Sequence, residues 1–304
     1  MLAAQDDDGR RLDRILRKAL PDLPLSGIHR LLRKGAVLVD GQPAEAADRI
    51  KAGSVIALPG VSAGEGVRSL RKPAEKSAEA CILWESPDLL VLNKPAGIAV
   101  HGPDSLDDLV QAYLRGKIAA SLSFKPGPLH RLDTPTSGII VFSKTLAGSR
   151  CFSGHLRDCR LRKTYLAVAD GRVTGPAAWT EPLIRDKTLR KTFAAGTGAS
   201  GRIAETLIRP LAVGDRYSLI AAEIRSGRTH QIRAHAGLHG HPLAGDRKYG
   251  GSVQKQGLLL HAYTLEFPAD SIPGAPAVLR APLPQAFRLR IAELFPEDAH
   301  LRDF

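Results

Sequence analysis

The chain has 304 residues, of which 43% are hydrophobic and 24% are charged. A chain of this length buries roughly 75% of the surface that it exposes when unfolded, and its apolar content excludes a disordered basic tail. Forty-three Lys and Arg against 31 Asp and Glu give a net charge of +12, which favours a polyanionic partner, either nucleic acid or an anionic membrane surface.

Cysteine usage and apolar patterning favour a cytoplasmic protein. Cys81, Cys151 and Cys159 are odd in number and form no CxxC pair, so we expect neither a disulfide framework nor a cysteine zinc site. The start, MLAAQDDD, lacks the basic and apolar regions of an export signal, and no 18 apolar residues run together. We therefore expect no membrane segment, and nucleic acid becomes the leading polyanion.

Residues 9–58 predict a small basic module with ten basic and five acidic side chains. The apolar spacing predicts a helix over 12–19, a second helix capped by Ser26, a strand near 37–39, a turn at Asp40-Gly41 and a returning strand at 54–58. In the second helix, Arg30, Arg33 and Lys34 are spaced three and four apart and share one face. That face is a candidate RNA-binding surface.

The rest of the chain predicts a linker over 59–80, rich in Gly, Ser, Ala, Lys and Pro, followed by a second domain over 81–304. Apolar patterns in this domain predict strands at 81–84, 89–92, 139–142, 164–169, 217–223 and 258–267, and helices at 106–114, 145–157 and 229–239. Ser105 and Asp108 form a capping box ahead of the first helix. These short strands favour an α+β fold over regular β-α-β alternation.

The segment HRLDTPTSG, residues 130–138, runs directly into an apolar strand. An Asp two residues before a Pro, followed by Thr, Ser and Gly, is typical of a structural turn, and composition alone favours that interpretation. The functional alternative is a carboxylate, Asp133, fixed on a tight loop close to Arg131. Such a carboxylate could serve as a nucleophile or as a base.

A second dense segment, residues 225–241, carries four histidines and three arginines. Thr229 is a candidate cap for a helix that places Arg233 about one turn inside. His235 and His239 are four residues apart and share a face, which suggests a metal site. No acidic residue lies in this segment and there is no HExxH pattern, so packing, capping and phosphate contacts are favoured over zinc.

The third segment, residues 160–167, places Tyr165 at the start of a strand beneath a basic cluster. A tyrosine in this position is more often part of a core or rim, but in a basic site it could stack on a nucleobase. The loop at Asn93–Gly97 has neither GxxxxGK[ST] nor GxGxxG. No nucleotide cofactor is therefore indicated.

Together, these segments resemble the RluA-type pseudouridine synthases, and especially the branch that modifies large-subunit ribosomal RNA. The motifs occur in the family's order, namely Asn93-Lys-Pro-Ala-Gly97, His130 to Gly138, Lys163-Thr-Tyr165, Gly227-Arg-Thr-His-Gln-Ile-Arg233 and Leu259-Leu-His-Ala262. Residues 9–58 resemble the small RNA-binding domain named after a small-subunit ribosomal protein. The resemblance implies a mainly antiparallel mixed sheet flanked by helices, and isomerisation of uridine by a monomer that needs no cofactor or metal.

The resemblance also implies roles for individual residues. Asp133 matches the catalytic aspartate, Tyr165 the tyrosine that packs on uracil, and Arg233 the arginine that pairs with the aspartate. Arg131 matches the loop arginine that fills the space left by the flipped base, and we further expect His130, Thr136 and Arg228 to contact the substrate. The family often has Arg or Asp where Thr134 and Pro135 stand, a difference that bears on loop contacts to RNA.

Two other classes of function compete with this interpretation. A non-catalytic RNA-binding or ribosome-assembly protein would share the charge, but binding alone does not require Asp133, Tyr165 and Arg233 together. A metal-dependent nuclease or hydrolase would use the histidines, but acidic ligands near His235 are missing. The basic excess is concentrated in residues 9–58, 144–163 and 225–248, which indicates an RNA path with salt-sensitive affinity.

Overall fold

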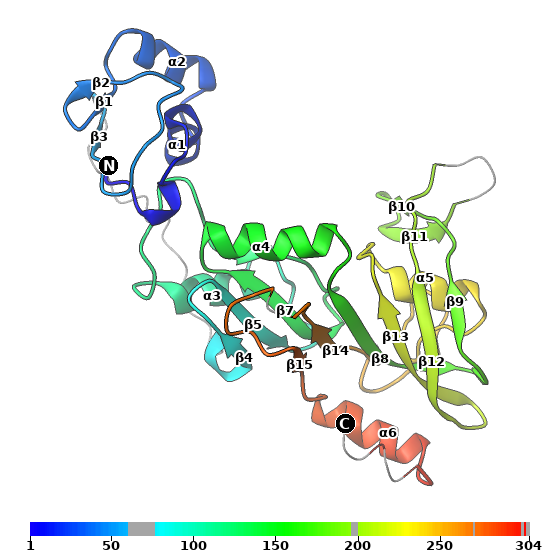
Figure 1. Cartoon of the computed structure of the whole chain (residues 1–304). Helices are drawn as coiled ribbons and strands as arrows, with labels where there is room; N and C mark the ends of the chain where they lie inside the picture. The colour runs from blue at the N-terminus through cyan, green and yellow to red at the C-terminus, as the bar shows by residue number, and fades with distance from the viewer. Residues whose placement is uncertain (60–76, 196–199, 270, 299–300, 302–304) are drawn as a thin grey trace.

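The computed structural model describes residues 1–59, 77–195, 200–269, 271–298 and 301. Most of the predicted linker, residues 60–76, lies outside the described residues. Its end does not: Ala78–Cys81 forms a short 3-10 helix, η2, in which Ala78 is buried. Figure 1 shows a small N-terminal module at one end of a larger sheet domain.

The N-terminal module contains two helices and three short strands. They are α1 (Leu12–Ala19), α2 (Leu25–Arg33), β1 (Leu38–Val39), β2 (Gln42–Pro43) and β3 (Ile56–Ala57), after a 3-10 helix η1 (Gln5–Asp7). The strands form a sheet in the order β2-β1-β3. Asp40 and Gly41 have φ of 50° and 83°, as a type I′ hairpin turn requires, so the predicted turn is confirmed.

The start of α2 differs from the prediction. Pro24, not Ser26, is the N-cap residue, and Ser26 lies inside the first turn. The carbonyl of Pro24 accepts the hydrogen bonds of Gly27 N and Ile28 N at 2.8 and 3.1 Å. Pro24 is extended, with φ of −64° and ψ of 151°, and the helix begins directly after it without a side-chain cap.

The larger domain is built on one ten-stranded mixed sheet. Its main path runs β4-β5-β7-β14-β8-β13-β12-β9, with β6 paired to β7 and β15 to β14. The strands are β4 (Ile82–Glu85), β5 (Leu89–Lys94), β6 (Gly127–Pro128), β7 (Ser137–Ser143), β8 (Arg162–Asp170), β9 (Ala177–Trp179), β12 (Thr206–Val213), β13 (Tyr217–Ile224), β14 (Leu260–Glu266) and β15 (Val278–Arg280). Only β7 and β14 pair in parallel among the described strands, so the α+β, mainly antiparallel prediction is confirmed.

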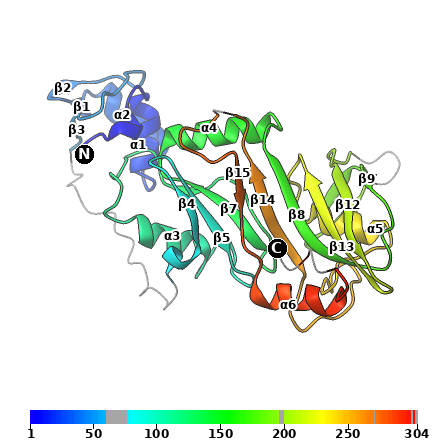
Figure 2. The same cartoon turned by 60° about the horizontal axis from the view of Figure 1, so that its bottom comes forward.

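Helices cover both faces of this sheet. They are α3 (Leu106–Leu114), α4 (Leu146–Arg157), α5 (Gln231–Leu238) and α6 (Gln285–Leu294). Leu90 of β5 packs in the same buried cluster as residues of α3 and α5, whereas its neighbour Leu89 packs with Phe152 of α4. Successive strand residues thus point to opposite layers. Figure 2 shows the sheet and its helices with the bottom of the view in Figure 1 turned forward.

Gly138 allows the parallel pair of strands at the centre of the sheet to approach closely. Its φ is +111°, and a Cβ atom there would lie 2.3 Å from the carbonyl oxygen of Ala262. Only glycine accommodates both that conformation and that contact. The loop that carries Asp133 therefore leads into a position of β7 that is held against β14.

A separate two-stranded hairpin, β10 (Leu183–Asp186) and β11 (Lys191–Ala194), stands near α5. Figure 1 shows it above the helix and away from the main sheet. Between them, β10, β11 and their connection carry four basic residues, Arg185, Lys187, Arg190 and Lys191, and one acidic residue, Asp186. The sequence patterns did not predict this hairpin, nor β6, β9, β12, β15 and α6.

A buried carboxylate joins the N-terminal module to the sheet domain. Asp7 is fully buried, and its side chain accepts hydrogen bonds from Ser121 Oγ at 2.8 Å and from the backbone N–H groups of Leu122 and Ser123 at 3.0 Å. Burial raises its pKa, but hydrogen bonds from the Ser123 side chain, from the backbone of Ala4 and Leu122 and from the Ser121 side chain outweigh burial and lower it. Arg10 also donates to the Ser123 carbonyl, at 3.0 Å, so we call these contacts the Asp7 joint.

None of the helices in the described part of the chain is long and apolar enough to cross a membrane.

Candidate active site

The three predicted catalytic residues meet in one pocket, although they come from distant parts of the chain. Asp133 lies on the loop between β6 and β7, Tyr165 on β8, and Arg233 on α5. Arg131, Thr136 and Arg228 also line this pocket. The apolar side chains of Leu132, Ile224, Ile232 and Leu260 form the rest of its wall, with His230 and Gln231.

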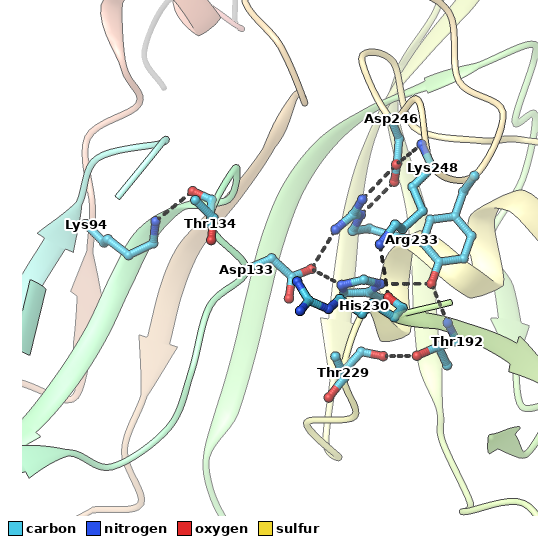
Figure 3. A network of polar contacts seen from close by, with 11 residues as sticks. Lys94, Asp133, Thr134, Thr192, Thr229, His230, Arg233, Asp246 and Lys248 are labelled. Carbon is cyan, nitrogen blue, oxygen red and sulfur yellow. Dashed lines mark hydrogen bonds and ion pairs between the residues drawn. The ribbon is translucent and has the colours of Figure 1, made fainter. Parts of the chain in front are cut away.

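Arg233 bridges two carboxylates. Its Nη1 donates to Asp133 Oδ2 at 2.9 Å, while its Nε and Nη2 donate to the two oxygens of Asp246 at 2.7 and 2.8 Å (Figure 3). Burial lowers the pKa of the guanidinium, but the paired carboxylates outweigh burial and raise it. Arg233 is therefore a permanent cation that points one nitrogen at Asp133.

Asp246 is a residue of the candidate site that the sequence patterns did not single out. It is 1% exposed, and it lies in the loop after α5, so only the folded chain brings it to Arg233. One signal was available, because Asp246 is the single acidic residue among positions 225–248. A lone acid within a basic segment is a natural partner for a buried arginine.

His230, not Thr229, is the N-cap residue of α5, and it adopts a left-handed conformation with φ of 56°. The carbonyl oxygen of Thr229 accepts a hydrogen bond from Thr192 Oγ1 at 2.9 Å. No side chain caps the start of α5. The ring of His230 turns into the site, with Nε2 3.7 Å from Asp133 Oδ2. Burial lowers the pKa of His230 to about 4, and the nearby Arg233 adds to this effect, so the ring is neutral at pH 7.

Tyr165 lines the pocket from β8 and is 8% exposed. Burial raises the pKa of its phenol, and the negative charge of Asp133 raises it further. The tyrosine is thus neutral at physiological pH. With Ile224 and Leu260 it gives the pocket an aromatic and apolar wall beside the carboxylate, which suits the face of a nucleobase.

Lys94 holds in place the loop that carries Asp133. The side chain is fully buried, and its Nζ donates to the carbonyl oxygens of Pro95, Ile98 and Thr134 at 2.9, 2.8 and 3.1 Å. Burial lowers the pKa of this ammonium to about 8, against the opposing charge of Asp133. The Asn93–Gly97 motif therefore contributes a tether between two loops, which Figure 3 shows at Thr134.

The predicted substrate-binding residues divide into two groups. Arg131 is exposed at the pocket, and Arg228 lines it while its Nε donates to the Ile203 carbonyl at 3.2 Å. Thr136 also lines the pocket, and its hydroxyl is buried without a hydrogen-bond partner among the described residues. A buried hydroxyl of this kind is suited to a bound polar group.

His130 is not among the residues that line this pocket. Its Nε2 accepts a hydrogen bond from Val141 N at 3.1 Å, and its ring stacks on Phe152 with centroids 6.0 Å apart. Burial lowers the pKa of His130 to about 3, and nearby Lys163 adds to this effect. The bond from Val141 N engages the ring as an acceptor and supports the loop. Contact of His130 with the substrate stays a prediction.

The remaining histidines of residues 225–241 have protein partners. His235 lies between Thr206 Oγ1, 2.8 Å from Nδ1, and the Glu181 carbonyl, 3.0 Å from Nε2. His239 stacks on Trp179 and lies 3.0 Å from Glu181 Oε2. The described residues contain no cluster of three or more metal-ligating side chains.

In the N-terminal module, Arg30, Arg33 and Lys34 are all exposed on α2 and at its end. Their role in RNA binding stays a prediction.

Known proteins share both parts of this architecture. The family model described as RNA pseudouridylate synthase matches residues 88–237, and the S4 domain model matches residues 10–56. Ribosomal large subunit pseudouridine synthase C of Salmonella typhimurium is 32% identical, over 94% of this chain and 93% of that protein. This chain belongs to the RNA pseudouridylate synthase family. It is therefore an isomerase with an RNA-binding S4 domain.

Further relatives agree with this family assignment. The protein of the same name from Escherichia coli K12 is 32% identical, over 92% of this chain and 90% of that protein. Human RNA Pseudouridylate Synthase Domain Containing 4 superposes with a TM-score of 0.59, over 71% of this chain and 94% of that chain, at 21% identity. The last comparison supports the pseudouridine synthase fold.

We predict that Asp246→Asn destabilises this pseudouridine synthase by about 3 kcal/mol, because it leaves the buried Arg233 cation with one charged partner. Chemical unfolding monitored by fluorescence measures the change. Asp215→Asn is the control, since Asp215 is fully exposed and its ion pair with Arg172, at 3.5 Å, lies at the surface. Equal stability of the two variants would contradict the structural role of Asp246.

We predict that His130 makes the folded state sensitive to acid. The pKa of this histidine rises from about 3 when folded to its ordinary value of 6.5 when unfolded, so the unfolded chain binds an extra proton between these pH values. The stabilisation is complete above pH 6.5 and falls by about 1.4 kcal/mol per pH unit below it. In urea unfolding from pH 7.5 to 4.5, His130→Gln should therefore show a flatter curve than the wild type. Parallel curves would refute the assignment.

Proposed function

We propose that this enzyme converts uridines of large-subunit ribosomal RNA into pseudouridine, with Asp133 as the catalytic carboxylate. The observation that carries this proposal is the asymmetric environment of Asp133. Arg233 Nη1 and His230 Nε2 both face Oδ2, whereas Oδ1 has no partner among the described residues. A carboxylate paired with a guanidinium on one oxygen leaves the other oxygen for the substrate.

Two chemical routes suit such a carboxylate. Oδ1 either attacks the anomeric carbon, C1′, or removes the neighbouring ribose proton to give a glycal. In both routes the bond from N1 of uracil to C1′ breaks and the base turns. C5 then forms the new bond to C1′ while the carboxylate either leaves C1′ or returns the proton to C2′, and C5 finally loses its own proton. The product is an isomer of the uridine, so the net reaction needs no oxidant and no energy source.

The pocket supports base flipping. Asp133 and Tyr165 are mostly buried, with side-chain exposure of 13% for Asp133 and residue exposure of 8% for Tyr165, so a stacked base in a helix cannot reach them. The uridine must leave its stack, at a cost of a few kcal/mol that is smallest in loops and distorted helices. Arg131, exposed beside the pocket, is placed to fill the gap that the base leaves.

The choice of RNA rests on the S4 domain and on the relatives. Relatives that match over most of both chains are named for the large ribosomal subunit, and Arg30, Arg33 and Lys34 present three exposed cations on the module. We accordingly assign the enzyme to the cytoplasm, acting as a monomer without a nucleotide cofactor. Transfer RNA is the alternative substrate within the same reaction.

We predict that Asp133→Asn binds RNA as the wild type does but lowers turnover by more than about 10³-fold, since the amide carries no negative charge for either route. Release of tritium from RNA labelled at C5 of uridine measures turnover, and filter binding measures affinity. Asp215→Asn, at an exposed position far along the chain, is the matched control with full activity. Appreciable turnover by Asp133→Asn would overturn the assignment of this residue.

We predict that loss of the gene removes specific pseudouridines from large-subunit ribosomal RNA, and that the wild-type gene restores them while Asp133→Asn does not. Carbodiimide treatment followed by primer extension maps these positions. Loss confined to transfer RNA would overturn the choice of substrate but not the reaction. Unchanged pseudouridines in both RNA classes would favour a non-catalytic RNA-binding role.

A further inference from the structure

The ring of His230 lies between the catalytic carboxylate and a second aromatic residue. Its Nε2 faces Asp133 Oδ2 at 3.7 Å, and its Nδ1 lies 2.9 Å from the hydroxyl oxygen of Tyr249. The two rings meet edge to face, with an interplanar angle of 87°. His230 thus has one nitrogen for the site and one for Tyr249, and its left-handed backbone directs the ring inward (Figure 3).

The charge of Asp133 favours one of the two neutral forms of this ring. If Nδ1 carried the hydrogen, the lone pair of Nε2 would face the carboxylate, which electrostatics disfavours. If Nε2 carries the hydrogen, its N–H dipole points at the carboxylate, and Nδ1 must then accept a hydrogen bond. The hydroxyl of Tyr249 is the donor at that distance.

Tyr249 is itself held so that its hydroxyl hydrogen is available. The backbone N–H of Thr192, on β11, donates to the Tyr249 oxygen at 2.8 Å, so the hydroxyl accepts there and can donate to His230. The ring packs with Arg233 Cζ 5.3 Å and Lys191 Nζ 5.0 Å from its centroid. The two cations that lie over the ring restrict its plane.

We propose that Tyr249 is a positioning residue, whose hydroxyl keeps His230 in the form with hydrogen on Nε2 and so keeps Asp133 Oδ2 turned away from the substrate. Tyr249 touches no reacting atom and acts through His230. This inference rests on the proposed role of Asp133. It also gives the β10–β11 hairpin a part in the reaction, because Thr192 supplies the bond that orients the tyrosine.

The first test reads the hydrogen position directly and requires no RNA. In protein labelled with ¹⁵N at histidine, long-range proton–nitrogen spectra distinguish the two neutral forms of the ring, and His230→Asn assigns the signal. We expect the wild type to show the form protonated at Nε2, and Tyr249→Phe to show a mixture. Tyr217→Phe is the matched control, because it removes a hydroxyl that accepts from Gln254, and it should leave the His230 signal unchanged.

The second test measures turnover on RNA labelled at C5 of uridine. We expect Tyr249→Phe to lower kcat about tenfold, the effect of one lost hydrogen bond, with KM for RNA within about twofold of the wild type. In a His230→Asn background the same change should lower kcat no further, because Tyr249 acts through that ring. Asn suits the left-handed conformation of position 230, so this background can fold.

Three outcomes would overturn the inference. They are an unaltered His230 signal in Tyr249→Phe, a wild-type kcat in that variant, or effects of the two substitutions that multiply in the double variant. If Tyr249→Phe fails to fold, Thr192→Pro, which removes the backbone donor to Tyr249 together with the Thr192 hydroxyl, replaces it in the same spectra. Thr192→Val, which removes the hydroxyl but keeps the backbone donor, is then the control. Failure of the wild-type protein to release tritium from any RNA would instead refute the proposed function, while the spectra would still report the hydrogen position.

Discussion

One buried cation shared by two carboxylates organises this active site. Arg233 would be costly to bury alone, since removing a guanidinium from water carries a penalty of several kcal/mol. Asp246 offsets that penalty through both of its oxygens, and the remaining nitrogen is left for Asp133. Because the three residues come from α5, the loop after it and the loop before β7, one ion pair network fixes how these elements meet.

The charged and titratable groups around this network are neutral or bonded to other partners. This leaves Asp133 with one pairing cation, as its proposed catalytic role requires. Burial keeps His230 and Tyr165 uncharged at neutral pH. The ammonium of Lys94 donates its hydrogen bonds to backbone carbonyl oxygens and not to the Asp133 carboxylate. In a setting of low dielectric, a fixed charge acts strongly on a nearby reacting centre. The scaffold thus isolates one carboxylate and one pairing cation beside an apolar wall.

The sequence predicted the parts of this arrangement that depend on local pattern. Long apolar strands such as β5 and β7 and the capping box at Ser105 were readable from spacing, and motif resemblance pointed to Asp133, Tyr165 and Arg233. The hairpin of β10 and β11 was missed because its strands are short and half polar. Their strand conformation depends on pairing with each other and not on an apolar pattern. Asp246 and the orientation of the His130 ring depend on tertiary contacts, which no local pattern specifies.

The Asp7 joint gives the enzyme a fixed geometry for reading RNA. Figures 1 and 2 place the S4 domain and α5 at opposite ends of the same sheet, and the joint bonds the module to that sheet through a buried carboxylate. The distance between the basic face of α2 and the Asp133 pocket is then fixed by the fold. On the proposed function, we expect an RNA to engage both sites only when its own fold holds the target uridine and a phosphate-rich surface at that separation. The tertiary shape of the RNA would then be a criterion of selection.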